Sequence, residues 1–80
     1  MTLADAVKCR ILSLCETEHI TLNRLSYRCG MTQSTLNNIV NGGSRNPKLA
    51  TIKKICDGLN ITLAEFFSSE EFDCLEQEIQ

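Results

Sequence analysis

Tryptophan is absent from the 80-residue sequence, which also has only one proline and four glycines. So few turn-forming residues leave little room for a turn-rich β architecture. No apolar run approaches the roughly 20 residues of a membrane-spanning helix, and residues 1–5 lack the basic start and apolar stretch of a signal peptide. The length suits one domain. We therefore expect a single small domain located in the cytoplasm, with no membrane partner.

Residue sets for catalysis or metal binding are also missing. The chain has one histidine, His19, expected in an exposed linker, and its five cysteines include no Cys-x-x-Cys pair. That composition argues against a disulfide framework and a zinc site. We expect about four thiols to be core residues, with Cys9 and Cys74 the least obvious; a thiol redox switch stays an alternative. With no Ser/His/Asp or Cys/His set, we predict no enzyme, no cofactor and no metal.

Charge is distributed very unevenly along the chain, whose net charge is −2. Residues 1–18 carry −1. Residues 19–56 carry six basic side chains and no acidic one, and residues 57–80 carry seven acidic side chains and no basic one. The basic middle predicts an anionic partner such as nucleic acid, provided that the acidic end lies away from the contact face.

Apolar residues recur at helical spacing, and strand-like alternation is absent, so we predict an all-α fold. Helices are expected over residues 3–18, 21–29, 33–41, 47–59 and 62–67, with a short extension helix within 69–80. Pro47 is expected near the first turn of the fourth helix, and 42–43 should end the third. Further signals mark helix ends: the pairs Thr2/Asp5 and Thr62/Glu65 as capping boxes, Thr32 as an N-cap, and Gly30 and Asn60 as left-handed C-caps.

Residues 22–40 have the requirements of a helix-turn-helix. Ser26 supplies a small side chain where two helices cross, Gly30 suits the turn, and apolar positions such as Leu25 and Leu36 fix both helices on the core. The outer face of the second helix carries short amides and hydroxyls instead of the better helix formers Glu and Lys. Such groups can hydrogen-bond to base edges in the major groove of DNA.

The run 20–42 together with the later pattern of Pro47, Ile52, Ile55 and 61–67 resembles the phage-repressor (Cro-like, XRE-type) helix-turn-helix family. The resemblance implies a five-helix repressor-like DNA-binding domain over residues 1–68, with recognition helix 33–41 in the major groove. An acidic amphipathic helix over 69–80 would serve packing or dimerisation.

The resemblance also implies roles for individual residues. The candidates for base reading are Gln33, Ser34, Thr35, Asn37 and Asn38. The candidates for phosphate contacts are Thr21, Asn23, Arg28, Asn41, Ser44, Arg45 and Lys48. Tyr27 is expected to pack at the rim, with a phosphate contact as the alternative. Leu22 replaces a common phosphate-binding glutamine, and an apolar Cys15–Val40 contact replaces a buried ion pair.

We therefore predict a sequence-specific regulator of transcription, a repressor of bacterial or phage type, that binds double-stranded DNA at a pseudo-palindromic operator. No small-molecule effector is implied. Phe72, Leu75 and Ile79 are expected to join a homodimer partner, or else to fold back onto the first and fifth helices. The alternative function is an antitoxin or anti-repressor that acts through protein contacts of the C-terminal region.

Overall fold

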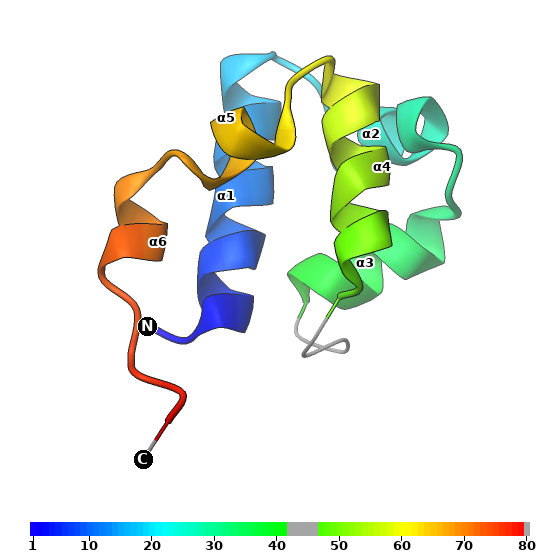
Figure 1. The fold of residues 1–80 in the computed structure, drawn as a ribbon. Coiled ribbons are helices and arrows are strands. Elements are labelled where there is room, and N and C mark those ends of the chain that lie inside the picture. Colours follow the sequence, from blue (N-terminus) through cyan, green and yellow to red (C-terminus); the bar gives the residue numbers. More distant parts are fainter. Residues whose placement is uncertain (42–46, 80) are drawn as a thin grey trace.

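The computed structural model describes residues 1–41 and 47–79, and it confirms the all-α prediction: the described residues contain helices and no strand (Figure 1). The helices are α1 (Leu3–Thr17), α2 (Leu22–Cys29), α3 (Gln33–Val40), α4 (Leu49–Leu59), α5 (Leu63–Phe67) and α6 (Glu70–Asp73). In the view of Figure 1, α5 and α6 lie on the side of α1, and α2 to α4 form the other side of the molecule.

Three connections between helices share one three-residue design. Each has a left-handed residue, then an apolar residue, then a threonine that caps the next helix: 19–21, 30–32 and 60–62. The backbone N–H of the apolar residue bonds to a carbonyl five residues earlier, at 3.0 Å from Ile20 to Cys15, 3.1 Å from Met31 to Ser26 and 3.0 Å from Ile61 to Cys56. This is the Schellman ending, which satisfies otherwise free carbonyls.

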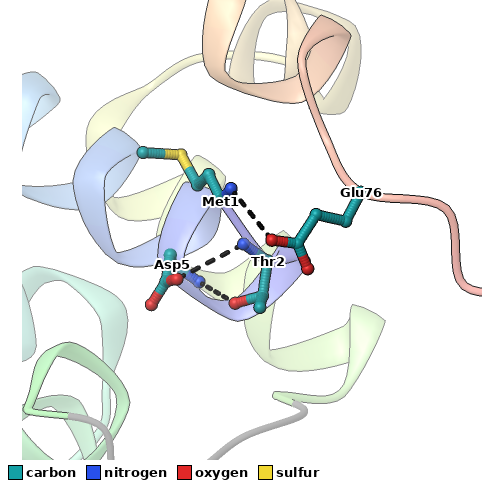
Figure 2. Close-up of polar contacts among 4 residues, drawn as sticks. All are labelled: Met1, Thr2, Asp5 and Glu76. Atoms are coloured by element: carbon teal, nitrogen blue, oxygen red, sulfur yellow. Dashed lines mark hydrogen bonds and ion pairs between the residues drawn. The ribbon is translucent and has the colours of Figure 1, made fainter.

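The threonine caps predicted from the sequence are confirmed. In α1 and α5 the cap is a full capping box, formed by Thr2 with Asp5 and by Thr62 with Glu65. The Asp5 carboxylate accepts from the Thr2 backbone N–H at 3.3 Å, and the Thr2 hydroxyl accepts from the Asp5 N–H at 3.2 Å (Figure 2). The bond from the Thr2 backbone N–H is the largest cause that lowers the pKa of Asp5, because it favours the charged form of the carboxyl.

The core is built from the inner faces of α1 to α5. Its largest fully buried side chains are Phe66, Ile11, Leu25, Leu36, Ile55 and Cys56. Burial of such a side chain stabilises the fold by about 1.5–3 kcal/mol, which matters in a chain this small. Three cysteines are buried, not the four expected, because Cys9 is half-buried and Cys74 is exposed.

Arg10 joins α1 to α5 by a contact that no local sequence pattern indicates. Its Nε donates to the Phe66 carbonyl and its Nη2 donates to the Glu65 carbonyl, both at 2.7 Å. α5 has only five residues, so its last carbonyls have few partners within the helix. The guanidinium of Arg10 supplies two hydrogen-bond donors to these carbonyls from one rigid group.

The C-terminal extension differs from the predicted helix over 69–80. α6 covers only Glu70–Asp73, and it has no basic side chain in its last turn that would favour a longer helix. Phe72 packs inside the chain, with its ring centroid 4.9 Å from that of Phe67 and 6.0 Å from that of Phe66. Leu75 is half-buried, whereas Ile79 is 83% exposed. The expected apolar face of the three residues is therefore divided.

The segment after α6 is attached to the start of α1. The Glu76 N–H donates to the Met1 carbonyl at 3.3 Å, and the Glu76 carboxylate lies 3.5 Å from the Met1 ammonium (Figure 2). Two smaller expectations also change. Pro47 precedes α4, whose N-cap is Lys48, and the Tyr27 ring is 83% exposed instead of packed at the rim. The predicted stop of α3 at 42–43 lies outside the described residues.

Candidate nucleic-acid interface

α2 and α3 are held on the core by their apolar faces. Leu25 and Cys29 of α2 are buried, as are Leu36, Ile39 and Val40 of α3. Ser26 is also buried, and its hydroxyl donates to the Asn23 carbonyl at 2.7 Å. A small side chain with an internal hydrogen-bond partner can therefore lie in the crossing region, as the sequence predicted.

The turn between α2 and α3 fixes how α3 is presented. Gly30 has φ 67°, a left-handed conformation that disfavours side chains with a Cβ. Thr32 then begins α3, since its hydroxyl accepts from the Thr35 N–H at 3.1 Å. The Thr35 hydroxyl shares a hydrogen bond of 2.8 Å with the Thr32 hydroxyl. The first turn of α3 is thus held by its own side chains.

The outer face of α3 carries the polar side chains singled out from the sequence. Gln33, Ser34, Thr35 and Asn38 are exposed, and Asn37 is half-buried at the edge of this face. None of the five is charged. The structure therefore brings the base-reading candidates together on one exposed helix surface, opposite the buried Leu36 and Ile39.

The phosphate-contact candidates that the structure describes lie on α2 and at the ends of α2, α3 and α4. Thr21, Asn23 and Arg28 are exposed at or on α2, and the Thr21 hydroxyl accepts from the Arg24 N–H at 3.1 Å. Asn41 is the exposed C-cap of α3, and Lys48 is the exposed N-cap of α4 without a side-chain cap bond. Two further candidates, Ser44 and Arg45, lie outside the described residues.

The departures from the usual family pattern are accounted for by burial. Cys15 and Val40 are both buried in the same core cluster. Burial raises the pKa of the Cys15 thiol, so it stays neutral at pH 7. Leu22 is half-buried and packs against the core. Neutral apolar packing thus stands where the family commonly has charged or amide side chains.

The acidic end of the chain lies away from α3. α6 is on one side of α1 in Figure 1, and α3 is on the other. On α4 the Lys53 ammonium pairs with the Asp57 carboxylate one turn later, whereas Arg24 and Arg28 of α2 are exposed. The surface around α3 is therefore free of the acidic residues 70–78, which would repel phosphate.

A family model described as a Cro/C1-type helix-turn-helix DNA-binding domain matches residues 10–71. The chain belongs to this family. The match covers α2 and α3 as well as α4 and α5, so membership rests on more than the helix-turn-helix alone. No curated protein and no solved structure matches the chain. As a Cro/C1-type domain, the protein binds DNA, and its family is in general not enzymatic.

Within residues 1–41 and 47–79, no three His, Cys, Asp or Glu side chains are grouped so that they could hold a metal ion. None of the described helices is long and apolar enough to cross a membrane.

Proposed function

We propose that this Cro/C1-type domain is a sequence-specific repressor of transcription that reads double-stranded DNA with α3 in the major groove. The observation that carries the proposal is the exposed, uncharged polar face of α3. Gln33 and Asn38 offer amides that can pair with two atoms of adenine, and the Thr35 methyl can contact a thymine methyl. Sequence information would come from these groups together with Ser34 and Asn37.

The surroundings of α3 support the same arrangement. Phosphate contacts would come from hydroxyl, amide and basic groups on α2, at the ends of α3 and α4, and in the sequence between these two helices, namely Thr21, Asn23, Arg28, Asn41, Ser44, Arg45 and Lys48. α4 begins at Leu49 without a side-chain cap, and the partial positive charge at such a helix start favours a phosphate. These groups would set the position of the protein on DNA, and α3 would set its sequence preference.

A single α3 of eight residues contacts only a few base pairs. We propose that the protein therefore acts as a homodimer on a pseudo-palindromic operator of bacterial or phage type, in the cytoplasm. The two half-sites would lie about one DNA turn, roughly 34 Å, apart. Repression would follow when the bound dimer covers a promoter. No effector is required by this scheme.

Selection of bound sequences from a random duplex library tests the proposal. We expect a short palindromic site with half-sites about one turn apart. Gln33→Ala or Asn38→Ala should weaken binding to that site by about 1–3 kcal/mol and relax the preference at one base pair per half-site. Lys54→Ala, at an exposed position of α4, is the control. Failure to enrich any duplex, even at low salt, would refute sequence-specific reading.

A further inference from the structure

α3 has none of the charged side chains that read G·C pairs. Arginine and lysine are the side chains that pair with the O6 and N7 atoms of guanine, and aspartate and glutamate accept from the N4 group of cytosine. None of these residue types occurs in α3 (Gln33–Val40). Its amides instead match adenine, and a threonine methyl matches the C5-methyl group of thymine. The composition of α3 therefore favours A·T pairs.

Thr35 offers a hydroxyl and a methyl group, and the hydroxyl is engaged within the protein. The Thr35 hydroxyl shares a hydrogen bond of 2.8 Å with the Thr32 hydroxyl. The Thr32 hydroxyl also accepts from the Thr35 backbone N–H at 3.1 Å, so two bonds join the N-cap to the first turn of α3. Both groups of Thr35 are attached to its Cβ, so the bond that orients the hydroxyl also orients the methyl.

The methyl is therefore the group of Thr35 that the cap leaves available. Thr35 is exposed, on the face of α3 that also carries exposed Ser34 and Asn38. A hydroxyl that read a base would have to give up or share its bond to Thr32, whereas a methyl contact leaves both bonds of the cap intact.

We propose that Thr35 reads thymine, with its methyl against the C5-methyl group of one thymine in each half-site while its hydroxyl stays on Thr32. This inference rests on the proposed function, since it names the base that one position of α3 recognises. The contact distinguishes thymine from uracil, which has the same hydrogen-bonding atoms and no C5-methyl group. Burial of one methyl group corresponds to about a fourfold change in affinity per half-site.

Replacement of single thymines by deoxyuridine, made in both half-sites of the duplex selected from the random library, tests the proposal. At one thymine position the wild type should lose about fourfold in affinity per half-site. Thr35→Ser removes the methyl and keeps the hydroxyl. This variant should bind the thymine duplex as weakly as the wild type binds the deoxyuridine duplex. It should lose nothing further when that thymine is replaced.

Thr35→Val and Thr17→Ser are the matched controls. Valine keeps a methyl group at position 35 and removes the hydroxyl, so Thr35→Val should retain the full loss on deoxyuridine. Thr17 of α1 is likewise an exposed threonine with a locally bonded hydroxyl, which donates to the Ser13 carbonyl at 3.0 Å. Thr17→Ser should leave the affinity and the loss on deoxyuridine unchanged. Circular dichroism melting confirms that each variant is folded.

The outcomes separate this inference from the proposed function. The assignment is wrong if Thr35→Ser and the wild type show equal losses at every thymine. It is also wrong if Thr35→Val shows no loss, since the hydroxyl would then be the reading group, or if the selected half-site contains no A·T pair. In these cases the selected duplex still demonstrates sequence-specific binding, and only the role of Thr35 fails. A library without any enriched duplex would refute the proposed function and this inference with it.

Discussion

A Cβ on Gly58 of α4 would lie 2.5 Å from the Sγ of Cys29 of α2. It would also lie 3.2 Å from the Cys29 backbone nitrogen, so part of the obstacle is the main chain itself. The absence of a side chain at Gly58 is thus what lets α4 approach the C-terminal end of α2. Because Gly30 and α3 follow Cys29 directly, this contact also helps to place the helix that is proposed to read DNA.

We expect Gly58→Ala to destabilise the protein, although alanine is the better helix former. The helix gains about 1 kcal/mol from alanine, but overpacking against α2 costs about 1–3 kcal/mol or more. Urea unfolding measures the balance. Lys54→Ala, on the exposed face of α4, should shift stability by less than about 0.5 kcal/mol.

The double variant Gly58→Ala with Cys29→Ala identifies the cause. Removal of the Sγ relieves the closest contact, so the two substitutions should be less damaging together than the sum of their separate effects. Strict additivity would mean that the thiol is not what opposes a side chain at Gly58.

The pKa of the Cys29 thiol predicts how stability depends on alkaline pH. Burial, with smaller contributions from Cys15 and Cys56, raises this pKa from 9.0 to about 11. The folded state therefore holds a proton that the unfolded state loses between these values. This contribution to stability is fully present below pH 9 and is lost as the pH rises through about 11.

Urea midpoints measured across this pH range should fall for the wild type and fall less steeply for Cys29→Ala. The slope should not vanish, because burial also raises the pKa values of Cys15 and Cys56. Thiol labelling gives an independent check: exposed Cys74 should react in the native protein, and Cys29 only after unfolding. An equal slope for Cys29→Ala and wild type would contradict the assignment.

Arg10→Lys tests the link between α1 and α5. Lysine keeps the positive charge but cannot reproduce two parallel bonds to the Glu65 and Phe66 carbonyls. We expect a loss of about 1–2 kcal/mol in the free energy of unfolding, since bonds from a charged donor contribute more than neutral ones. Arg24→Lys, at an exposed position of α2, is the control and should be nearly neutral. Equal effects of the two would show that the Arg10 bonds contribute little.

The sequence predicted those parts of the fold that local chemistry determines. Thr2, Thr32 and Thr62 cap helices because the threonine hydroxyl accepts from the backbone N–H three residues later. Gly30 and Asn60 adopt the left-handed conformation because each ends a helix as its C-cap, which depends only on neighbouring residues. The polar face of α3 was likewise visible as an exception to helix propensity.

Contacts between distant residues could not be predicted in this way. Arg10 and Phe66 are 56 positions apart, and nothing near either residue indicates the other. Phe72 and Ile79 fit one helical face in the sequence, but α6 covers only Glu70–Asp73. The segment after α6 instead runs to Met1, where the Glu76 N–H donates to the Met1 carbonyl, and Phe72 and Ile79 do not share one face. The requirement for a glycine at position 58 likewise could not be predicted, because it depends on the position of α2 in the fold.

Lys48→Gln tests whether the start of α4 contacts the DNA backbone. If Lys48 neutralises one phosphate, its loss should reduce the slope of log K against log salt by about 0.9 per half-site. Binding should weaken alike for all sequences, because phosphates carry no sequence information. Lys53→Gln is the matched control, since the Lys53 ammonium is paired with Asp57 on the same helix. A slope that both substitutions change equally, or that neither changes, would remove Lys48 from the proposed interface.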